Sequence, residues 1–299
     1  MKNDILVIGG YGVAGQTICR ELGRKAPGRV FAAGRNLERA ERFCRTTAGS
    51  VLPLRLDIRE PIGEHFFARF RAVVMCLDQE NTDFLRACIR SGTHYADVTA
   101  NNSFLSKAEG LHEDARANGA AVVLSVGLAP GLTNLLALEA VNRMDATATL
   151  DISVMLGLGD SHGDAAMEWT LQNVNKSFEV TENGGKVSVS AFTDGKLVDF
   201  GTGFGRKKAY RFNFPDQHTL PRTLRVPSVS TRLCFDSGAA TMLLAGLKAV
   251  NMLSFLETKP VRRAAIRVAG LIRWGQDSYA LKVDAWGKRT SAMFMWNAF

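Results

Sequence analysis

Six residues near the N-terminus have the types and spacing of a phosphate-binding turn. Gly10-Tyr11-Gly12-Val13-Ala14-Gly15 lies between an apolar run, residues 5–8, and a helical pattern. In such a turn the first glycine permits the tight bend, the second lets a pyrophosphate approach the backbone, and the third allows the helix to pack closely. The start of the helix adds amide groups and a positive dipole end. The pattern predicts a binding site for the pyrophosphate of a dinucleotide.

The next apolar run ends in a second candidate binding residue, Arg35, followed by Asn36. Proteins that bind NAD carry Asp or Glu near this point to hold the ribose hydroxyls, whereas a guanidinium pairs with a 2′-phosphate. The sequence therefore predicts NADP over NAD, with a solvated surface arginine as the alternative. Arg39, one helical turn on, could assist. Three further residues complete the predicted cofactor-binding set: Asp57, Leu77 and Asp78.

Three residues are candidates for proton transfer. Tyr95 and Asp97 stand two apart on one predicted strand, so they project to the same side and could share a ligand. A buried polar pair that fixes the strand explains this spacing equally well. His162 lies in Gly159-Asp160-Ser161-His162-Gly163, before a helix that bears Trp169, and could supply a base. A capped loop with a core tryptophan is the alternative there.

Basic residues in the second half offer a further possibility, since a guanidinium or ammonium group could hold a substrate carboxylate. A solvated basic face is the competing interpretation. The residues concerned are Arg206, Lys207, Lys208 and Arg232.

The elements that must position these residues follow two rhythms. Strand-like runs at residues 5–8, 30–33, 51–56, 73–77, 95–98 and 121–125 alternate with helical patterns at 15–24, 37–45, 83–90 and 105–118. This alternation predicts a six-stranded parallel sheet covered on both faces, with ligands bound beyond the carboxyl ends of its strands. After residue 131, runs at 150–156, 186–190, 207–212 and 279–286 alternate in polarity, with helical patterns at 132–142, 165–176, 239–253 and 261–271. Alternation of that kind predicts an antiparallel sheet.

We therefore predict an α/β protein of two domains. An N-terminal Rossmann domain with a doubly wound parallel sheet, residues 1–128, binds NADP. A second α+β domain with a mostly antiparallel sheet, residues 129–299, binds the substrate and forms a dimer. The apolar run at residues 293–299 docks on the body or on a second subunit.

Composition narrows the classes of function. With 46% hydrophobic and 22% charged residues the chain is globular, and its net charge of +8 suits phosphates or acidic substrates. The basic residues form no stripe, so a nucleic-acid partner is not expected. No pair of the five cysteines has metal-site spacing, so we expect no metal and a reducing, cytoplasmic location. Residues 119–138 carry no charge, but Gly127, Pro130 and Gly131 interrupt them, so no membrane span is expected.

Four motifs, IGGYGVAGQ, AGRN, ACIRSGTHYADVT and GLAPGLTNLL, occur in this order between residues 8 and 136. The combination resembles the saccharopine dehydrogenase-like, or saccharopine reductase-like, NADP-dependent oxidoreductases. The resemblance implies hydride transfer between NADPH and a carbon bonded to nitrogen, which reduces an imine formed from an amine and a carbonyl compound. It also implies that Tyr95, Asp97 and residues 127–131 flank the nicotinamide and the substrate.

One position departs from that family pattern. Members that act on amino acids or polyamines commonly carry an acidic residue in the loop, as GxDPG, where this chain has Ala129. The departure argues against ordinary saccharopine or homospermidine chemistry.

Other functions stay open at this point. The enzyme could reduce a carbonyl or an alkene, or the chain could bind NADP as a non-catalytic sensor. A short-chain dehydrogenase mechanism is disfavoured, because it needs a lysine four residues after a tyrosine, and Tyr95, Tyr210 and Tyr279 all lack one.

Overall fold

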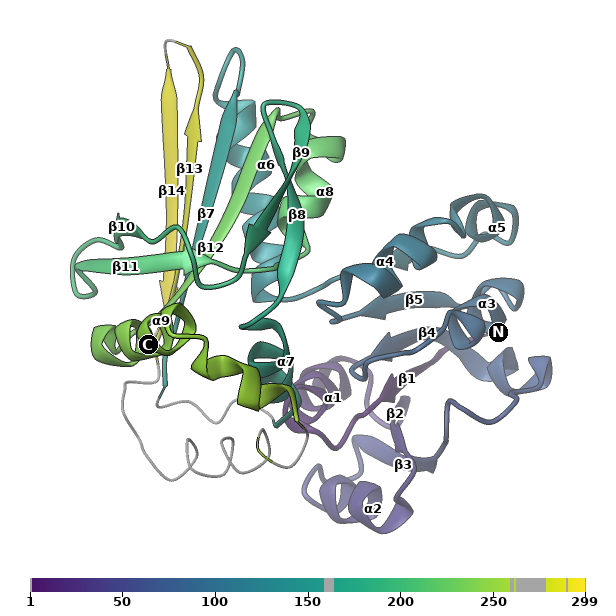
Figure 1. Cartoon of the computed structure of the whole chain (residues 1–299). Coiled ribbons are helices and arrows are strands. Elements are labelled where there is room, and N and C mark those ends of the chain that lie inside the picture. The colour runs from purple at the N-terminus through teal and green to yellow at the C-terminus, as the bar shows by residue number, and fades with distance from the viewer. Residues whose placement is uncertain (1, 159–163, 259–260, 262–277, 289, 299) are drawn as a thin grey trace. The chain divides into compact units, whose positions relative to one another are not determined.

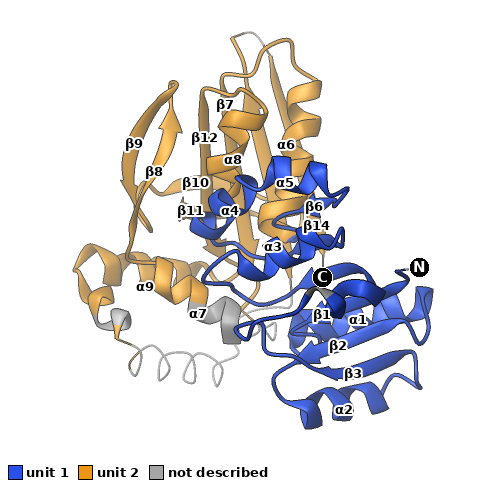
Figure 2. Cartoon of the chain, turned by 90° about the vertical axis from the view of Figure 1, so that its right-hand side faces the viewer, with its two compact units in different colours: residues 1–127 blue, residues 128–299 orange. Residues whose placement is uncertain are grey.

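The computed structural model describes residues 2–158, 164–258, 261, 278–288 and 290–298 (Figure 1). The chain forms two compact units, residues 1–127 and residues 128–299 (Figure 2). Among the described residues no helix is both long and apolar enough to cross a membrane.

Unit 1 is built on a parallel sheet with the strand order β3-β2-β1-β4-β5-β6. Its strands are β1 (Asp4–Ile8), β2 (Val30–Gly34), β3 (Val51–Arg55), β4 (Phe70–Met75), β5 (His94–Asp97) and β6 (Val122–Val123). All five pairings are parallel, and the chain reverses its direction of winding between β1 and β4. The structure thus confirms the predicted Rossmann fold, in which ligands bind beyond the carboxyl ends of the strands at such a reversal.

The helices of unit 1 connect these strands. They are α1 (Val13–Lys25), α2 (Leu37–Arg45), α3 (Asp83–Arg90), α4 (Asn102–Glu109) and α5 (His112–Ala117), with a 3₁₀ helix η1 (Glu64–Arg69). The pattern at residues 105–118 predicts one helix, but the structure has two. The first of them, α4, begins three residues earlier than expected, because Asn101 caps it by accepting the Ser103 and Phe104 backbone amides. Gly110 is its C-cap residue, where the helix ends.

The apolar alternation of the strands explains why helices cover both faces of this sheet. In β1, Leu6 and Ile8 join one hydrophobic cluster, whereas Val7 joins another with Cys19 of α1 and Phe43 of α2. A strand buried on both faces needs apolar side chains at successive positions. The strand is therefore held rigidly, and so is the turn at its carboxyl end.

Unit 2 contains a second six-stranded sheet with the order β10-β11-β12-β7-β13-β14. Its strands are β7 (Thr149–Leu156), β10 (Lys196–Asp199), β11 (Arg206–Arg211), β12 (Ser228–Phe235), β13 (Tyr279–Trp286) and β14 (Ser291–Ala298). Within the described strands of this second sheet only β12 and β7 pair in parallel; the other four pairings are antiparallel. This confirms the predicted mostly antiparallel sheet.

The remaining elements of unit 2 are a hairpin and several helices. The hairpin joins β8 (Ser177–Glu182) to β9 (Gly185–Ser190). The helices are η2 (Leu128–Leu132), α6 (Thr133–Asn142), α7 (Asp164–Asn173), α8 (Asp216–Thr223), α9 (Gly238–Ala249) and η3 (Met252–Glu257). Apart from residue 261, the helical pattern predicted at residues 261–271 lies outside the described residues.

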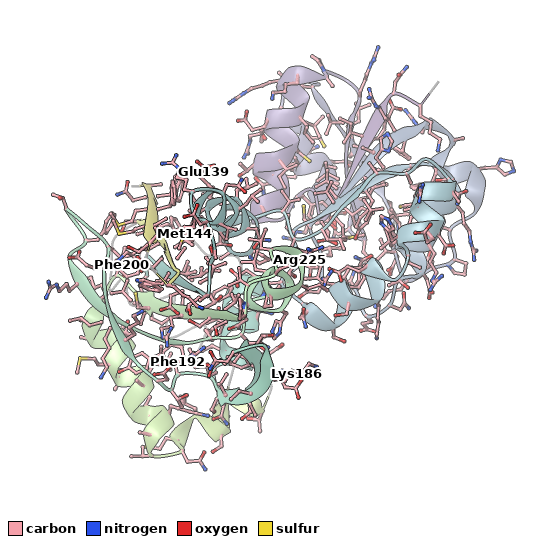
Figure 3. All side chains as sticks on the ribbon, turned by 90° about the horizontal axis from the view of Figure 1, so that it is seen from above. Glu139, Met144, Lys186, Phe192, Phe200 and Arg225 are labelled. Carbon is pink, nitrogen blue, oxygen red and sulfur yellow. The ribbon has the colours of Figure 1, made fainter. Side chains whose placement is uncertain are left out.

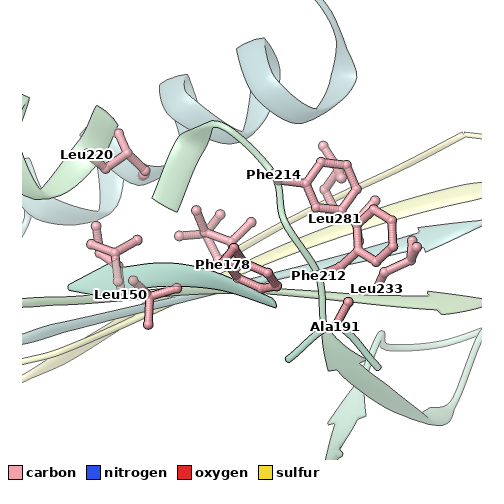
Figure 4. Close-up of a cluster of buried hydrophobic side chains, with 14 of the residues drawn as sticks. Leu150, Phe178, Ala191, Phe212, Phe214, Leu220, Leu233 and Leu281 are labelled. Carbon is pink, nitrogen blue, oxygen red and sulfur yellow. The ribbon is translucent and has the colours of Figure 1, made fainter. Parts of the chain in front are cut away.

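A core of aliphatic and aromatic side chains fills one face of the second sheet. Leu150 on β7, Leu233 on β12 and Leu281 on β13 pack with Phe212 and Phe214 (Figure 4). Phe192 belongs to this main cluster, whereas Phe200 packs with Met155 in a separate, smaller cluster. Both phenylalanines are labelled in Figure 3. Among the described residues each unit therefore has its own hydrophobic clusters, two in unit 1 and two in unit 2.

Candidate functional site

The glycine turn after β1 is shaped by close contacts that leave no room for side chains. Gly9 adopts a φ of +75°, a left-handed conformation that suits glycine. A Cβ on Gly15 would lie 2.2 Å from the Gly9 carbonyl oxygen, and one on Gly10 would lie 2.7 Å from the Cα of Ala32. The turn therefore packs tightly on β2 and under the start of α1.

The start of α1 is open to solvent. Gly12 is the N-cap residue, and no side chain of the described residues caps this helix end. Gly12, Val13 and Ala14 are exposed, Val13 by 58%. The first amides of a helix have no partner within the helix. Uncapped amides at the positive end of the helix dipole, approached over a glycine, suit a pyrophosphate group.

The turn after β2 carries Arg35 and Asn36, both exposed. Asn36 caps α2, because its Oδ1 accepts a hydrogen bond of 2.9 Å from the Arg39 amide. The backbone amide of Asn36 donates to the Tyr11 hydroxyl of the glycine turn at 3.0 Å. Among the described residues Arg35 forms no ion pair, so its guanidinium is free for an anion. These contacts connect the two turns at the carboxyl ends of β1 and β2.

Asp57, beyond the end of β3, is held by a residue that the sequence analysis did not single out. The Arg59 guanidinium donates to both carboxylate oxygens, with Nε to Oδ1 at 2.9 Å and Nη2 to Oδ2 at 2.5 Å. These hydrogen bonds, together with the Arg59 amide, lower the pKa of Asp57 to about 2, and the charge of Arg35 adds to the effect. The carboxylate is therefore neutralised where it would otherwise repel a phosphate.

Asp78 and Leu77 follow β4, and both are exposed, Leu77 by 42%. The Thr99 hydroxyl donates to Asp78 Oδ1 at 3.0 Å. Leu77 contacts the glycine turn, since its Cδ2 lies 2.9 Å from the point where a Cβ on Gly9 would stand. The fourth strand thus contributes an apolar and an acidic side chain to the same edge.

Asp97 organises the loops after β5 and β6. It is 1% exposed, and its Oδ1 accepts the amides of Ser125 at 2.9 Å and Thr99 at 3.3 Å. The Ser125 hydroxyl returns a hydrogen bond to the Thr99 carbonyl at 3.1 Å. Burial raises the pKa of Asp97 to about 6, although both amide hydrogen bonds oppose the shift. The Asp97 side chain therefore ties two loop segments together from inside the unit.

Tyr95 is also buried, with 1% of its surface exposed, and belongs to the core of unit 1. Its hydroxyl accepts a hydrogen bond of 2.6 Å from the Gln79 amide. Burial, and next the charge of Asp97, raise the pKa of Tyr95 far above its ordinary value. Of the two interpretations that the sequence left open for this pair, a buried polar pair that fixes the strand is the one that the burial favours.

The structure brings the candidate cofactor residues together on one edge of unit 1. Of the basic candidates in the second half, Arg206, Lys207 and Lys208 lie on β11, and Arg232 lies on the neighbouring strand β12. His162 lies outside the described residues. Arg232 is buried and already pairs with Asp194 at 2.6 Å and Asp151 at 3.3 Å. The Lys207 ammonium group donates to the Asp236 carbonyl at 2.7 Å. These two cations are thus engaged within unit 2.

Two residues of this edge, Arg59 and Ser125, were not singled out by the sequence analysis. Arg59 had a local signal, because it stands two residues after Asp57, whereas only the fold reveals that the Ser125 amide has Asp97 as its partner. Among the described residues no group of three or more His, Cys, Asp or Glu side chains could hold a metal ion.

Comparisons with known proteins agree with this geometry. Residues 5–123 match the family model of the saccharopine dehydrogenase NADP binding domain. Apo saccharopine dehydrogenase (L-Glu forming) from Saccharomyces cerevisiae has a similar fold, with a TM-score of 0.69 and 13% identity over 99% of this chain and 86% of that one. A probable dehydrogenase from Thermotoga maritima gives a TM-score of 0.46 and 9% identity over 97% and 75% of the two chains. No curated protein matched the sequence.

The match confirms the resemblance and the cofactor. Residues 5–123 cover the glycine turn, Arg35, Asp57 and the strands that carry them, so this unit binds NADP. The open amides of α1 fit the pyrophosphate of that cofactor, and the free guanidinium of Arg35 fits its 2′-phosphate.

Proposed function

We propose that this oxidoreductase reduces the C=N bond of an imine. The premise is that residues 5–123 match the saccharopine dehydrogenase NADP binding domain. The imine would form from an amine and a carbonyl compound. Two observations support the proposal: the family match, and the solvent exposure of the α1 amides and of Arg35 at the edge of the unit 1 sheet. The solved structure of similar fold is named as an L-Glu forming saccharopine dehydrogenase, which acts on a nitrogen-bearing compound.

Each residue of the edge has a role in this proposal. When bound, NADPH supplies the hydride. The amides at the start of α1 bind its pyrophosphate, and Arg35 binds its 2′-phosphate. Arg59 keeps the Asp57 carboxylate neutralised beside that phosphate. Asn36 holds the β2–α2 turn in place, and Leu77 and Asp78 border the glycine turn.

Tyr95, Asp97 and His162 stay a prediction as catalytic residues. Because Tyr95 and Asp97 are each 1% exposed in unit 1, we propose that they act by positioning. Asp97 holds the loops that follow β5 and β6, and Tyr95 holds Gln79 in the loop after β4. The loops in turn shape the edge of the sheet where the nicotinamide of an NADP-binding Rossmann domain is expected.

Three parts of the proposal rest on the sequence alone: a homodimer, a cytoplasmic location and a carboxylate-bearing substrate. For the carboxylate, two exposed residues remain candidates: Lys208, and Arg206, whose ion pair with Asp199 at 3.7 Å is itself exposed. Arg232 is buried and paired. Size-exclusion chromatography with light scattering tests the dimer directly; a monomer at micromolar concentration would remove it.

The first experiment measures cofactor choice. Isothermal titration with NADPH and NADH compares the wild type with Arg35→Ala, and Arg90→Ala is the matched control, because Arg90 is an exposed arginine at the last turn of α3. Loss of a charged hydrogen-bonding partner should weaken NADPH about 10- to 100-fold and leave NADH nearly unchanged. Equal affinities in wild type and Arg35→Ala would refute the role assigned to Arg35.

A second experiment separates the imine reductase from its alternatives. NADPH oxidation is followed with pairs of an amine and an aldehyde or ketone, with each carbonyl compound alone, and with activated alkenes. Turnover that requires the amine supports the proposal. Turnover with the carbonyl compound or alkene alone favours those reductases, and NADPH binding without turnover favours a sensor.

A further inference from the structure

Tyr11, which follows Gly10 in the glycine turn, packs its ring directly over Gly34 at the end of β2. A Cβ at Gly34, the last residue of β2, would lie 2.4 Å from the Tyr11 hydroxyl oxygen. Glycine at that position therefore makes room for the tyrosine ring. The same hydroxyl accepts the Asn36 amide at 3.0 Å, and the Tyr11 carbonyl accepts the Gln16 side-chain amide at 3.1 Å. The hydroxyl end of the ring is thus held at the β2–α2 turn, and the Tyr11 backbone is held by the Gln16 side chain of α1.

The face of this ring holds a cation. The guanidinium carbon of Arg39 lies 5.4 Å from the centre of the Tyr11 ring, within the range of a cation–π contact. The Arg39 amide is fixed as well, by its hydrogen bond to Asn36 Oδ1. Tyr11 and Asn36 together restrict an otherwise exposed arginine that stands four residues after Arg35.

We propose that Tyr11 is a positioning residue for the choice of NADP over NAD, acting through Arg39. It holds the Arg39 guanidinium beside the β2–α2 turn, so that a second cation is in place with Arg35 when the 2′-phosphate arrives. The inference rests on the proposed role of Arg35 and adds a second residue pair to it. An arginine already held in position loses less side-chain freedom on binding, which favours affinity.

The arrangement makes the two phosphate-binding turns depend on one another. Tyr11 belongs to the turn that binds the pyrophosphate, whereas Arg39 belongs to the helix that follows the 2′-phosphate turn. A ring that only filled space against Gly34 would affect both cofactors equally. A ring that positions Arg39 affects NADPH alone, because NADH lacks the 2′-phosphate.

The test compares three variants by isothermal titration with NADPH and NADH. Tyr11→Leu removes the ring, Tyr11→Phe keeps the ring and removes the hydroxyl, and Arg39→Ala removes the cation. We expect Tyr11→Leu and Arg39→Ala each to weaken NADPH about three- to tenfold, with NADH changed by less than about twofold. Tyr11→Phe should retain most of the preference. The double variant Tyr11→Leu/Arg39→Ala should be no worse than Arg39→Ala, because both changes remove the same contact.

The other outcomes are distinct. If Arg39→Ala weakens NADPH but Tyr11→Leu does not, or if Tyr11→Leu weakens both cofactors equally, the inference is wrong while the proposed role of Arg35 stands. If the wild type shows no preference for NADPH, the role of Arg35 fails first and the inference fails with it. Melting temperatures of the free proteins show whether a variant has lost its fold, and Tyr11→Phe remains informative if Tyr11→Leu has.

Discussion

Two halves of the same sheet edge in unit 1 are built in opposite ways. Beyond β1 and β2 the polar groups are exposed: α1 begins without a side-chain cap, and Arg35 and Asn36 face solvent. Around the ends of β4 and β5, Gln79, Tyr95 and Asp97 are buried and hydrogen-bonded within the chain. Of the side chains in this half that could meet a ligand, Leu77 and Asp78 are exposed. The first half is open to a ligand, whereas the second holds its own loops.

Two aspartates show what this difference does to a carboxyl group. Asp57 has its pKa lowered to about 2, because Arg59 donates to both of its oxygens. Asp97 has its pKa raised to about 6, because burial outweighs the two backbone amides that it accepts. At neutral pH the first is a fully charged partner for cations, while the second is close to its titration range. One residue type thus serves electrostatic balance in one half and internal support in the other.

The largest effect on stability is expected from a substitution that disrupts the glycine turn in the open half. Gly15→Ala places a Cβ 2.2 Å from the Gly9 carbonyl oxygen, so the backbone of the turn must shift. We expect a loss of about 3 kcal/mol of stability or more, and a melting temperature lower by roughly 6–12 °C. NADPH affinity should fall with it. Differential scanning calorimetry and titration measure both.

Gly12→Ala is the matched variant. Its Cβ would meet only the Gly9 carbonyl oxygen, at 3.2 Å, and its φ of −79° and ψ of 174° suit alanine. Stability should therefore change by less than about 1 kcal/mol, while the added methyl weakens NADPH by more than about tenfold where the pyrophosphate approaches. Equal losses of stability in the two variants would contradict the contacts described for the turn.

The closed half gives a pH-dependent prediction. Because the pKa of Asp97 is raised in the folded protein, the folded state binds a proton more tightly than the unfolded chain does. The stabilisation by the Asp97 carboxyl group is therefore fully present below about pH 4 and is lost as the pH rises through about 6. The free energy of unfolding falls by about 3 kcal/mol at most. Asp97→Asn keeps an oxygen that accepts the same amides but cannot titrate. The wild type should lose stability relative to Asp97→Asn across this pH range.

Urea unfolding of both proteins at several pH values between 4 and 8 measures the difference. All other carboxyl groups are common to the two proteins, so their contributions cancel. Parallel curves would show that folding leaves the pKa of Asp97 unshifted, and a relative gain by the wild type at higher pH would mean that folding lowers the pKa of Asp97 instead of raising it.

The fold class was predictable, but in unit 2 the strands β8, β10, β12 and β14 and the helix α8 were not predicted, and the omission of β12 has a physical reason. The Rossmann strands are short apolar runs bounded by turns, which the parallel arrangement requires on both faces. In unit 2, however, β12 was not predicted although it is a central strand. Its sequence alternates Val229, Thr231 and Leu233 with Ser230 and Arg232, and the partners of Arg232 come from β7 and from the chain before β10. Polar residues with distant partners conceal a buried strand.

The candidate site divides in the same way. The glycine pattern and Arg35 could be found from the sequence, because both act through local geometry: a turn, a helix start and a strand end. Ser125 could not, since it matters through one partner, Asp97, which stands 28 residues away and whose proximity follows from the fold. The accessibility of Tyr95 and Asp97 could not be predicted either, because strand spacing shows which way a side chain points and not what covers it.

The smallest effect sharpens the comparison at Tyr95. Tyr95→Phe removes the oxygen that accepts the Gln79 amide and leaves that donor buried without its partner. We expect a loss of about 1–2 kcal/mol of stability and no more than about a twofold change in NADPH affinity. Tyr95→Phe/Gln79→Leu removes both members of the pair and should recover part of the stability, because the Gln79 donor is no longer left buried without a partner. Calorimetry and titration on the two variants distinguish the interpretations: if Tyr95→Phe keeps its stability and NADPH affinity but stops turnover, Tyr95 is catalytic, and the closed half of the edge does more than hold its own loops.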